Sequence, residues 1–172
     1  ALSDLIARTR TSGHALVLEG DPGIGKTALL QAAADEAERA GFTVLRCAGH
    51  QSSGGVGFEA LHELLRPLLP LVGTLPPRQR AALLVAFGLE EGPAPDRFLI
   101  NLACLGLLEE AASTRRIFLA IDDGQWLDPS SSAVLSFVAR RLSQAPVLLV
   151  ATRRTRADGE DPSPRALDRL VV

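Results

Sequence analysis

The stretch that decides the fold lies near the start of the chain and reads Gly20-Asp21-Pro22-Gly23-Ile24-Gly25-Lys26-Thr27. It matches the pattern G-x-x-x-x-G-K-[ST] in full, and it lies between a short apolar run and an alanine-rich stretch with helical spacing. Glycines let backbone N–H groups approach phosphate oxygens without an intervening Cβ, and a helix N-terminus favours the same negative charge. The sequence therefore predicts a phosphate-binding loop between a buried strand and a helix.

The polar side chains of this loop have expected partners in a nucleoside triphosphate. Lys26 is expected to contact the β- and γ-phosphates, and the Thr27 hydroxyl is expected to bind Mg²⁺. Lys26 is the only lysine among 18 basic residues, and its compact ammonium has a different geometry from the planar fork of arginine. The predicted nucleotide-binding residues are the loop and the residue after it: Gly20, Asp21, Pro22, Gly23, Ile24, Gly25, Lys26, Thr27 and Ala28.

A second motif follows the apolar run 117–121, which ends in two adjacent carboxylates, Asp122 and Asp123. Ligands bind at the carboxyl ends of the strands in open α/β sheets. Asp122 is predicted to hold Mg²⁺, and Asp123 to orient or deprotonate the attacking water. Taken alone, Asp122 is more often a turn residue that ends a strand than a metal ligand, and it is the phosphate loop upstream that favours the magnesium role.

A third candidate is Arg153, which follows the apolar run 147–152. Arginine is suited to sensing a γ-phosphate because its guanidinium offers several N–H donors to phosphate oxygens. A plain basic turn is the alternative, and Arg154 and Arg156 compete for the same role. The predicted site then has ATP and Mg²⁺ as cofactors, with catalytic residues Lys26, Asp123 and Arg153 and metal ligands Thr27 and Asp122.

The apolar patterning predicts an α/β chain in which strands alternate with helices. The expected strands are continuously apolar runs at 15–19, 43–48, 117–121 and 147–152. The expected helices cover 2–11, 26–40, 58–69, 78–87, 97–113 and 130–142, with Asp96 as an N-cap. Residues 153–164 have the composition of a loop, and residues 165–172 that of a further helix or the approach to a strand. Buried, non-alternating strands indicate a parallel sheet covered on both faces, which is a three-layer α/β/α sandwich.

Composition narrows the classes of function. The chain has 172 residues, 47% hydrophobic and 22% charged, which fits one folded domain over 1–172. A net charge of −2 argues against a nucleic-acid-binding module by itself. Two cysteines without CxxC spacing, no signal peptide and no membrane-length apolar run predict a cytoplasmic chain. The three histidines have no metal-binding spacing, and Trp126 is expected to pack the loop after the third strand. The chain lacks methionine and is interpreted as a fragment of a longer protein.

Taken together, these stretches resemble the STAND class of P-loop ATPases, and in particular the large ATP-binding regulators of the LuxR family of transcription activators. The resemblance covers nearly the whole chain. Its most specific part is the run Asp-Asp-x-x-Trp-Leu-Asp, because the phosphate loop is common to many families. The matching stretches are 18–30, 58–68, 95–98, 121–128, 137–142 and 151–154.

The resemblance implies a parallel sheet in the order 2-3-4-1, with a fifth strand and a helical lid beyond Val172. It implies a switch in which ATP favours self-association and slow hydrolysis to ADP resets the domain. The absence of a glutamate directly after Asp122 is compatible with slow turnover. DNA would be contacted only through a helix-turn-helix outside this fragment, no membrane is involved, and the family's adenine-binding stretch would precede Leu2.

Other readings remain open at this point. A motor-type AAA+ ATPase or loader acting on DNA shares the same two motifs, although the net charge disfavours DNA-facing loops. A small-molecule kinase would show a short lid soon after the third strand, which is not evident. A GTPase is disfavoured because no Asn-Lys-x-Asp stretch exists. A folded nucleotide-binding piece without activity of its own is the remaining alternative.

Overall fold

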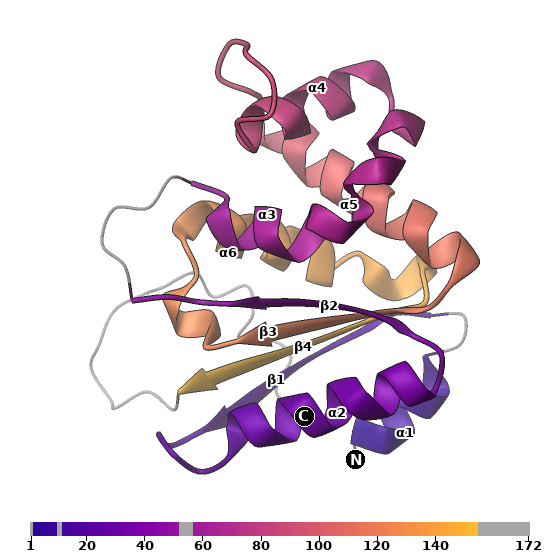
Figure 1. Cartoon of the computed structure of the whole chain (residues 1–172), viewed down its shortest axis with the longest axis vertical. Coiled ribbons are helices and arrows are strands. Elements are labelled where there is room, and N and C mark those ends of the chain that lie inside the picture. The colour runs from indigo at the N-terminus through magenta and orange to yellow at the C-terminus, as the bar shows by residue number, and fades with distance from the viewer. Residues whose placement is uncertain (1, 10–11, 52–56, 155–172) are drawn as a thin grey trace.

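The computed structural model describes residues 2–9, 12–51 and 57–154, which build one parallel sheet covered by helices (Figure 1). Its strands are β1 (His14–Gly20), β2 (Thr43–Ala48), β3 (Ile117–Asp122) and β4 (Val147–Arg154). All neighbouring strands are parallel, and their order is β1-β4-β3-β2. The predicted order 2-3-4-1 is therefore confirmed for these strands, and it places the ends of β1, β3 and β4 side by side.

Helices cover both faces of the sheet, as predicted. The helices α1 (Leu2–Arg8) and α2 (Lys26–Arg39) lie on one face, and α3 (Glu59–Leu65) and α6 (Pro129–Ala139) lie on the other (Figure 1). The helices α4 (Pro77–Ala86) and α5 (Arg97–Thr114) stack beyond α3 and α6. Alternate residues of each strand point to opposite faces of the sheet. Phe118 and Leu148 pack towards α2, whereas Leu119 and Leu149 belong to the larger core on the opposite face, which includes residues of α3 and α6.

Most element boundaries agree with the sequence, and two helices do not. The single helix expected at 58–69 is α3 followed by a 3₁₀ segment, η1 (Arg66–Thr74). Pro67 and Pro70 explain the change, because neither has the backbone N–H that an α-helix needs. The helix expected at 130–142 ends at Ala139, and the chain turns so that buried Leu142 accepts a hydrogen bond from the Gly13 N–H at 3.1 Å.

The two ends of the described chain also differ from expectation. Helix α1 ends at Arg8 rather than at residue 11. Arg153 and Arg154 belong to β4, where they are paired in register with Glu19 and Gly20 of β1. The loop was predicted to start at residue 153, which is two residues too early. The remainder of that loop and the element expected at 165–172 lie outside the described residues. Among the described helices, none has the length and apolar character needed to cross a bilayer.

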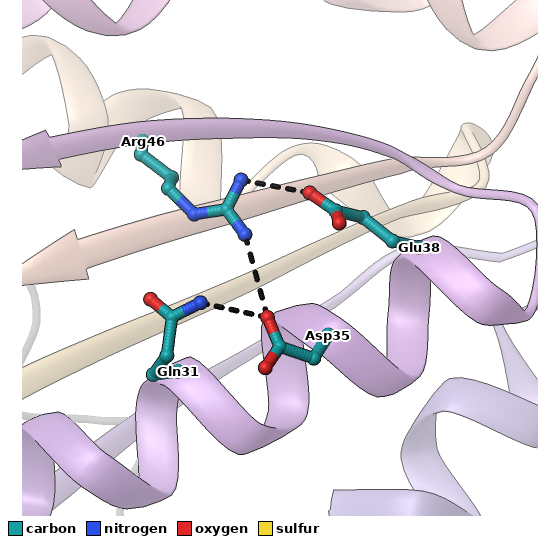
Figure 2. A network of polar contacts seen from close by, with 4 residues as sticks. All are labelled: Gln31, Asp35, Glu38 and Arg46. Atoms are coloured by element: carbon teal, nitrogen blue, oxygen red, sulfur yellow. Dashed lines mark hydrogen bonds and ion pairs between the residues drawn. The ribbon is translucent and has the colours of Figure 1, made fainter.

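A polar network fixes α2 to the edge strand β2 (Figure 2). Arg46 of β2 donates to Glu38 at 2.9 Å and lies 3.9 Å from Asp35, which also accepts from Gln31 at 2.7 Å. Each pair is partly exposed and contributes little alone, but the shared arginine and its two partners form a network. Because α2 begins at Lys26, this network helps to hold the helix that carries the phosphate loop.

The carboxylate of Asp128 caps the N-termini of two helices. It accepts from the Ser131 N–H at 2.8 Å at the start of α6, and from the Phe58 and Ala60 N–H groups at 2.9 and 3.4 Å at the start of α3. Partial burial alone would raise the pKa of Asp128, but the hydrogen bonds from Ser131, Phe58 and Ala60 outweigh it and lower that pKa. The ionised side chain thus ties the loop after β3 to α3.

Replacing Asp128 with alanine is expected to lower the free energy of unfolding by about 2 kcal/mol, because two helix N-termini lose one cap each. Asp96 provides the matched control, because among the described residues its carboxylate accepts from one helix N-terminus, through the Phe98 N–H at the start of α5. Asp96→Ala is expected to cost about 1 kcal/mol. Urea unfolding of both variants measures the difference, and equal costs would contradict the double cap.

The contribution of Asp128 also has a predicted pH dependence. Because the folded-state pKa of this carboxyl lies below its ordinary value of 3.8, the stabilisation is present above that value and is lost as the pH falls through the folded-state pKa.

Candidate nucleotide-binding site

The phosphate loop joins the end of β1 to the start of α2, as the sequence predicts. Two of its glycines adopt left-handed backbone conformations, with φ of 80° at Gly23 and 98° at Gly25. A side chain at either position would be strained, whereas glycine is not. Gly25 is the N-cap of α2, so the loop presents the amino end of a 14-residue helix to any bound anion.

Lys26 lies at the centre of this loop. Its ammonium donates to the Gly20 and Asp21 carbonyl oxygens, each at 2.8 Å. These are neutral acceptors at the rim of the loop, and a phosphate oxygen is a stronger partner because it carries charge. The loop therefore holds the ammonium beside the space in which a phosphate group would lie.

Asp122 joins three elements through one oxygen atom. Its Oδ1 accepts from the Thr27 hydroxyl of α2 at 3.2 Å, from the Thr152 hydroxyl of β4 at 2.5 Å and from the Asp123 N–H at 3.1 Å. Thr152 is 1% exposed, so its hydroxyl requires this partner. The structure thus brings the two predicted metal ligands, Thr27 and Asp122, into direct contact, and their paired hard oxygens suit Mg²⁺.

Asp123 has an unusual backbone for a residue other than glycine, with φ of 49°. Its N–H is shared between Asp122 and Thr152, the second at 2.8 Å. Its carboxylate accepts from the Gln125 side-chain amide at 2.7 Å. The left-handed conformation turns the chain sharply after β3 and places both aspartates at the same end of the sheet.

Arg153 is placed differently from the other predicted residues. Its guanidinium pairs with Glu19 of β1, with a distance of 2.8 Å between Nε and Oε1. Thr152, its neighbour in β4, points to the other face of the sheet, towards Asp122. Sequence reasoning missed both Glu19 and Thr152. A signal existed for Thr152, because it is a polar residue in an apolar, buried run.

Of the two residues that competed with Arg153, the structure describes only Arg154, whose side chain extends towards Trp126. The Arg154 guanidinium lies over the Trp126 ring at 5.9 Å, and Arg156 lies outside the described residues. Trp126 itself belongs to the short 3₁₀ segment η2 (Gly124–Trp126), in the loop that it was expected to pack.

A cavity of about 1080 Å³ opens beside the phosphate loop. It lies between α1, α2 and the outer edge of β1, and it reaches Gly25 and Lys26. Apolar side chains that include Leu5, Leu18 and Leu29 form much of its wall. A concave, mostly apolar space with a few polar groups is typical of small-molecule sites.

Comparison with known proteins identifies the family of the chain. Residues 1–150 match the family described as AAA ATPase domain. No curated protein matches the chain. Among solved structures, AMPPCP-bound DnaA from Aquifex aeolicus is similar at 16% identity and a TM-score of 0.47, over 99% of this chain and 43% of that one. PCH-2 from C. elegans is similar at 15% identity and a TM-score of 0.49, over 99% of this chain and 40% of that one.

The family match covers both motifs that were read from the sequence, and the fold places them at the same end of the sheet. The chain spans less than half the length of either solved structure to which it is similar. With its phosphate loop, the two aspartates at the end of β3 and the parallel sheet that joins them, the chain belongs to the AAA ATPase domain family.

Proposed function

We propose that this AAA ATPase domain is an ATP-operated signalling switch of the STAND class, within a LuxR-type transcription regulator. ATP bound with Mg²⁺ favours a self-associating state, and slow hydrolysis to ADP returns the domain to its resting state. The observation that carries the nucleotide part is the hydrogen bonding around Asp122, which joins α2, β3 and β4 at one oxygen atom. The regulator class is supported by the sequence resemblance, above all by the run from Asp122 to Asp128.

In this proposal the chain's own residues have separate tasks. Lys26 exchanges its carbonyl partners for phosphate oxygens. Thr27 and Asp122 hold Mg²⁺, which supplies charge neutralisation to the phosphates when bound. Asp123 orients the attacking water, and the apolar cavity beside the loop accommodates the nucleoside.

Arg153 has a conditional place in this scheme. It serves as a phosphate sensor only if it leaves Glu19, so the ion pair and the phosphate compete for the same guanidinium. Glu19 lies directly before Gly20, where the phosphate loop begins, and such competition would couple phosphate binding to the pairing of β1 with β4.

The rival function is a motor or loader ATPase that acts on DNA. It shares the AAA ATPase domain and the same site residues, so the site alone favours neither. The net charge of −2 favours the switch, because a DNA-facing surface carries an excess of basic residues.

Nucleotide-dependent assembly of the intact protein tests the switch. Light scattering after size-exclusion chromatography is run with MgATP, a non-hydrolysable ATP analogue and MgADP. We expect ATP and the analogue to raise the association constant about tenfold or more over ADP, as differential binding to two states requires. Equal assembly in all three nucleotides would exclude the switch, and rapid turnover stimulated by DNA would favour the motor.

A further inference from the structure

Gln125 bridges the loop after β3 and the end of β4 through both ends of its amide. Its Nε2 donates to Oδ1 of Asp123 at 2.7 Å, and its Oε1 accepts from the Arg154 N–H at 3.2 Å. Only a side chain with a donor and an acceptor on one planar group makes both bonds in this orientation. Neither the phosphate loop nor the metal ligands account for this arrangement.

The carboxylate of Asp123 is anchored on one side by this bridge. Its Oδ1 accepts from Gln125, whereas no hydrogen bond to Oδ2 occurs within residues 2–9, 12–51 and 57–154. The backbone of Asp123 is fixed separately, because its N–H is bound to Asp122 and Thr152. The orientation of the side chain therefore depends on Gln125, which leaves Oδ2 to accept a proton from water.

We propose that Gln125 is a positioning residue, whose two hydrogen bonds fix the orientation of the Asp123 carboxylate relative to the end of β4. The inference rests on the proposed role of Asp123 in orienting the attacking water. It goes beyond that role because it makes the alignment of the water-orienting group depend on where β4 ends. A displacement of Arg154 is then transmitted through Gln125 to the Asp123 carboxylate, whereas Thr152 links β4 to the Asp123 backbone.

If Gln125 positions Asp123, its replacement is expected to lower the rate of ATP hydrolysis without changing the affinity for the nucleotide. Gln125 does not touch the phosphate loop, and its removal is therefore expected to leave nucleotide affinity intact. Misalignment of a water-orienting carboxylate, by contrast, lowers the rate of the chemical step. The surroundings tolerate substitution, because Gln125 is half-buried and lines an open hollow of about 840 Å³ bounded by Trp126 and residues of α3.

The test uses two substitutions in the intact protein, each with a matched control at exposed Gln144 in η3 (Leu142–Gln144). Gln125→Leu removes both hydrogen bonds. We expect kcat for MgATP hydrolysis to fall about tenfold, while KM and the directly measured Kd for ATP stay within about twofold. Gln144→Leu is expected to change none of these values.

Gln125→Glu adds a second measurement, the pH dependence of kcat relative to wild type. This dependence would not be expected if Gln125 only stabilised the fold. The introduced carboxyl donates to Asp123 only while it is protonated, and once ionised it repels the Asp123 carboxylate. The ratio of the variant's kcat to that of wild type is therefore expected to fall, by up to about tenfold, as the pH rises and the introduced carboxyl ionises. For Gln144→Glu the ratio is expected to stay flat.

The outcomes distinguish this inference from the proposed function. Loss of ATP binding in the Gln125 variants would overturn the inference, as would wild-type kcat in Gln125→Leu or a flat pH ratio in Gln125→Glu. Measurable ATP binding with no hydrolysis in wild type would also overturn it; the ATP-dependent assembly of the proposed switch would remain, without its reset by hydrolysis. Absence of ATP binding in wild type would remove the proposed function itself. Melting curves confirm that each variant is folded at the assay temperature.

Discussion

ATP binding is expected to weaken about 100-fold when Lys26 is replaced by alanine, which corresponds to about 2.7 kcal/mol. The ammonium already lies in the phosphate loop, held by two carbonyl oxygens that a phosphate replaces. Alanine removes the charge without filling the loop. Calorimetry with MgATP and MgADP on the intact protein measures the loss directly.

Two further variants sharpen this result. Lys26→Arg keeps the charge but replaces a compact ammonium with a planar fork, so it is expected to bind ATP nearly as poorly as the alanine variant. Arg39→Ala removes a cation from the exposed last turn of the same helix and is expected to bind ATP like wild type. Wild-type affinity in Lys26→Ala would contradict the assignment of this loop.

Hydrolysis of ATP is expected to fall at least about 100-fold in Asp122→Asn, because the amide lacks the charge that holds Mg²⁺. The amide oxygen still accepts from Thr27 and Thr152, so the hydrogen bonding of the site and the fold are expected to survive. Turnover measured against increasing Mg²⁺ reports the effect, while ATP binding without Mg²⁺ is expected to match wild type.

The matched control for this variant is Asp35→Asn. Asp35 is an exposed carboxylate on α2, where it belongs to the Arg46 network rather than to the nucleotide site. Its replacement is expected to leave turnover within about twofold of wild type. Full activity of Asp122→Asn at saturating Mg²⁺ would show that another residue holds the metal.

Local chemistry explains which parts of the fold could be predicted from the sequence. The strand at Thr43–Ala48 has the predicted bounds and the helix capped by Asp96 has the predicted start, because apolar runs and caps act over a few residues. The helix expected at 58–69 was too long because apolar spacing continues through Pro67 while the backbone cannot. The sheet order came from the family resemblance, since spacing along the chain does not contain it.

The candidate site was predictable where a motif carries it, and otherwise it was not. Residue type and spacing within the two motifs identify Lys26, Thr27 and Asp122. Gln125 and Glu19 form hydrogen bonds to residues that are distant in sequence, and no local pattern marks such pairs. For Thr152 the only local signal was its polarity within an apolar run, which does not identify its partner Asp122. Asp128 was not predicted as a cap, since the helix was expected to begin at residue 130, although an aspartate before Pro129 is a recognisable start of a helix.

The pairing of β1 with β4 also affects how the domain folds during its synthesis. Glu19 and Arg153, which pair at the end of these strands, are 134 positions apart in the chain. At a synthesis rate of about 5 to 20 residues per second, the ribosome releases the phosphate-binding sequence roughly 7 to 27 s before its partner strand. Among the strands that the structure describes, β4 is the neighbour of β1, so β1 is unpaired throughout that interval, and closing so long a loop is slow. A nucleotide can therefore stabilise the phosphate loop of the folded domain only after β4 has been made.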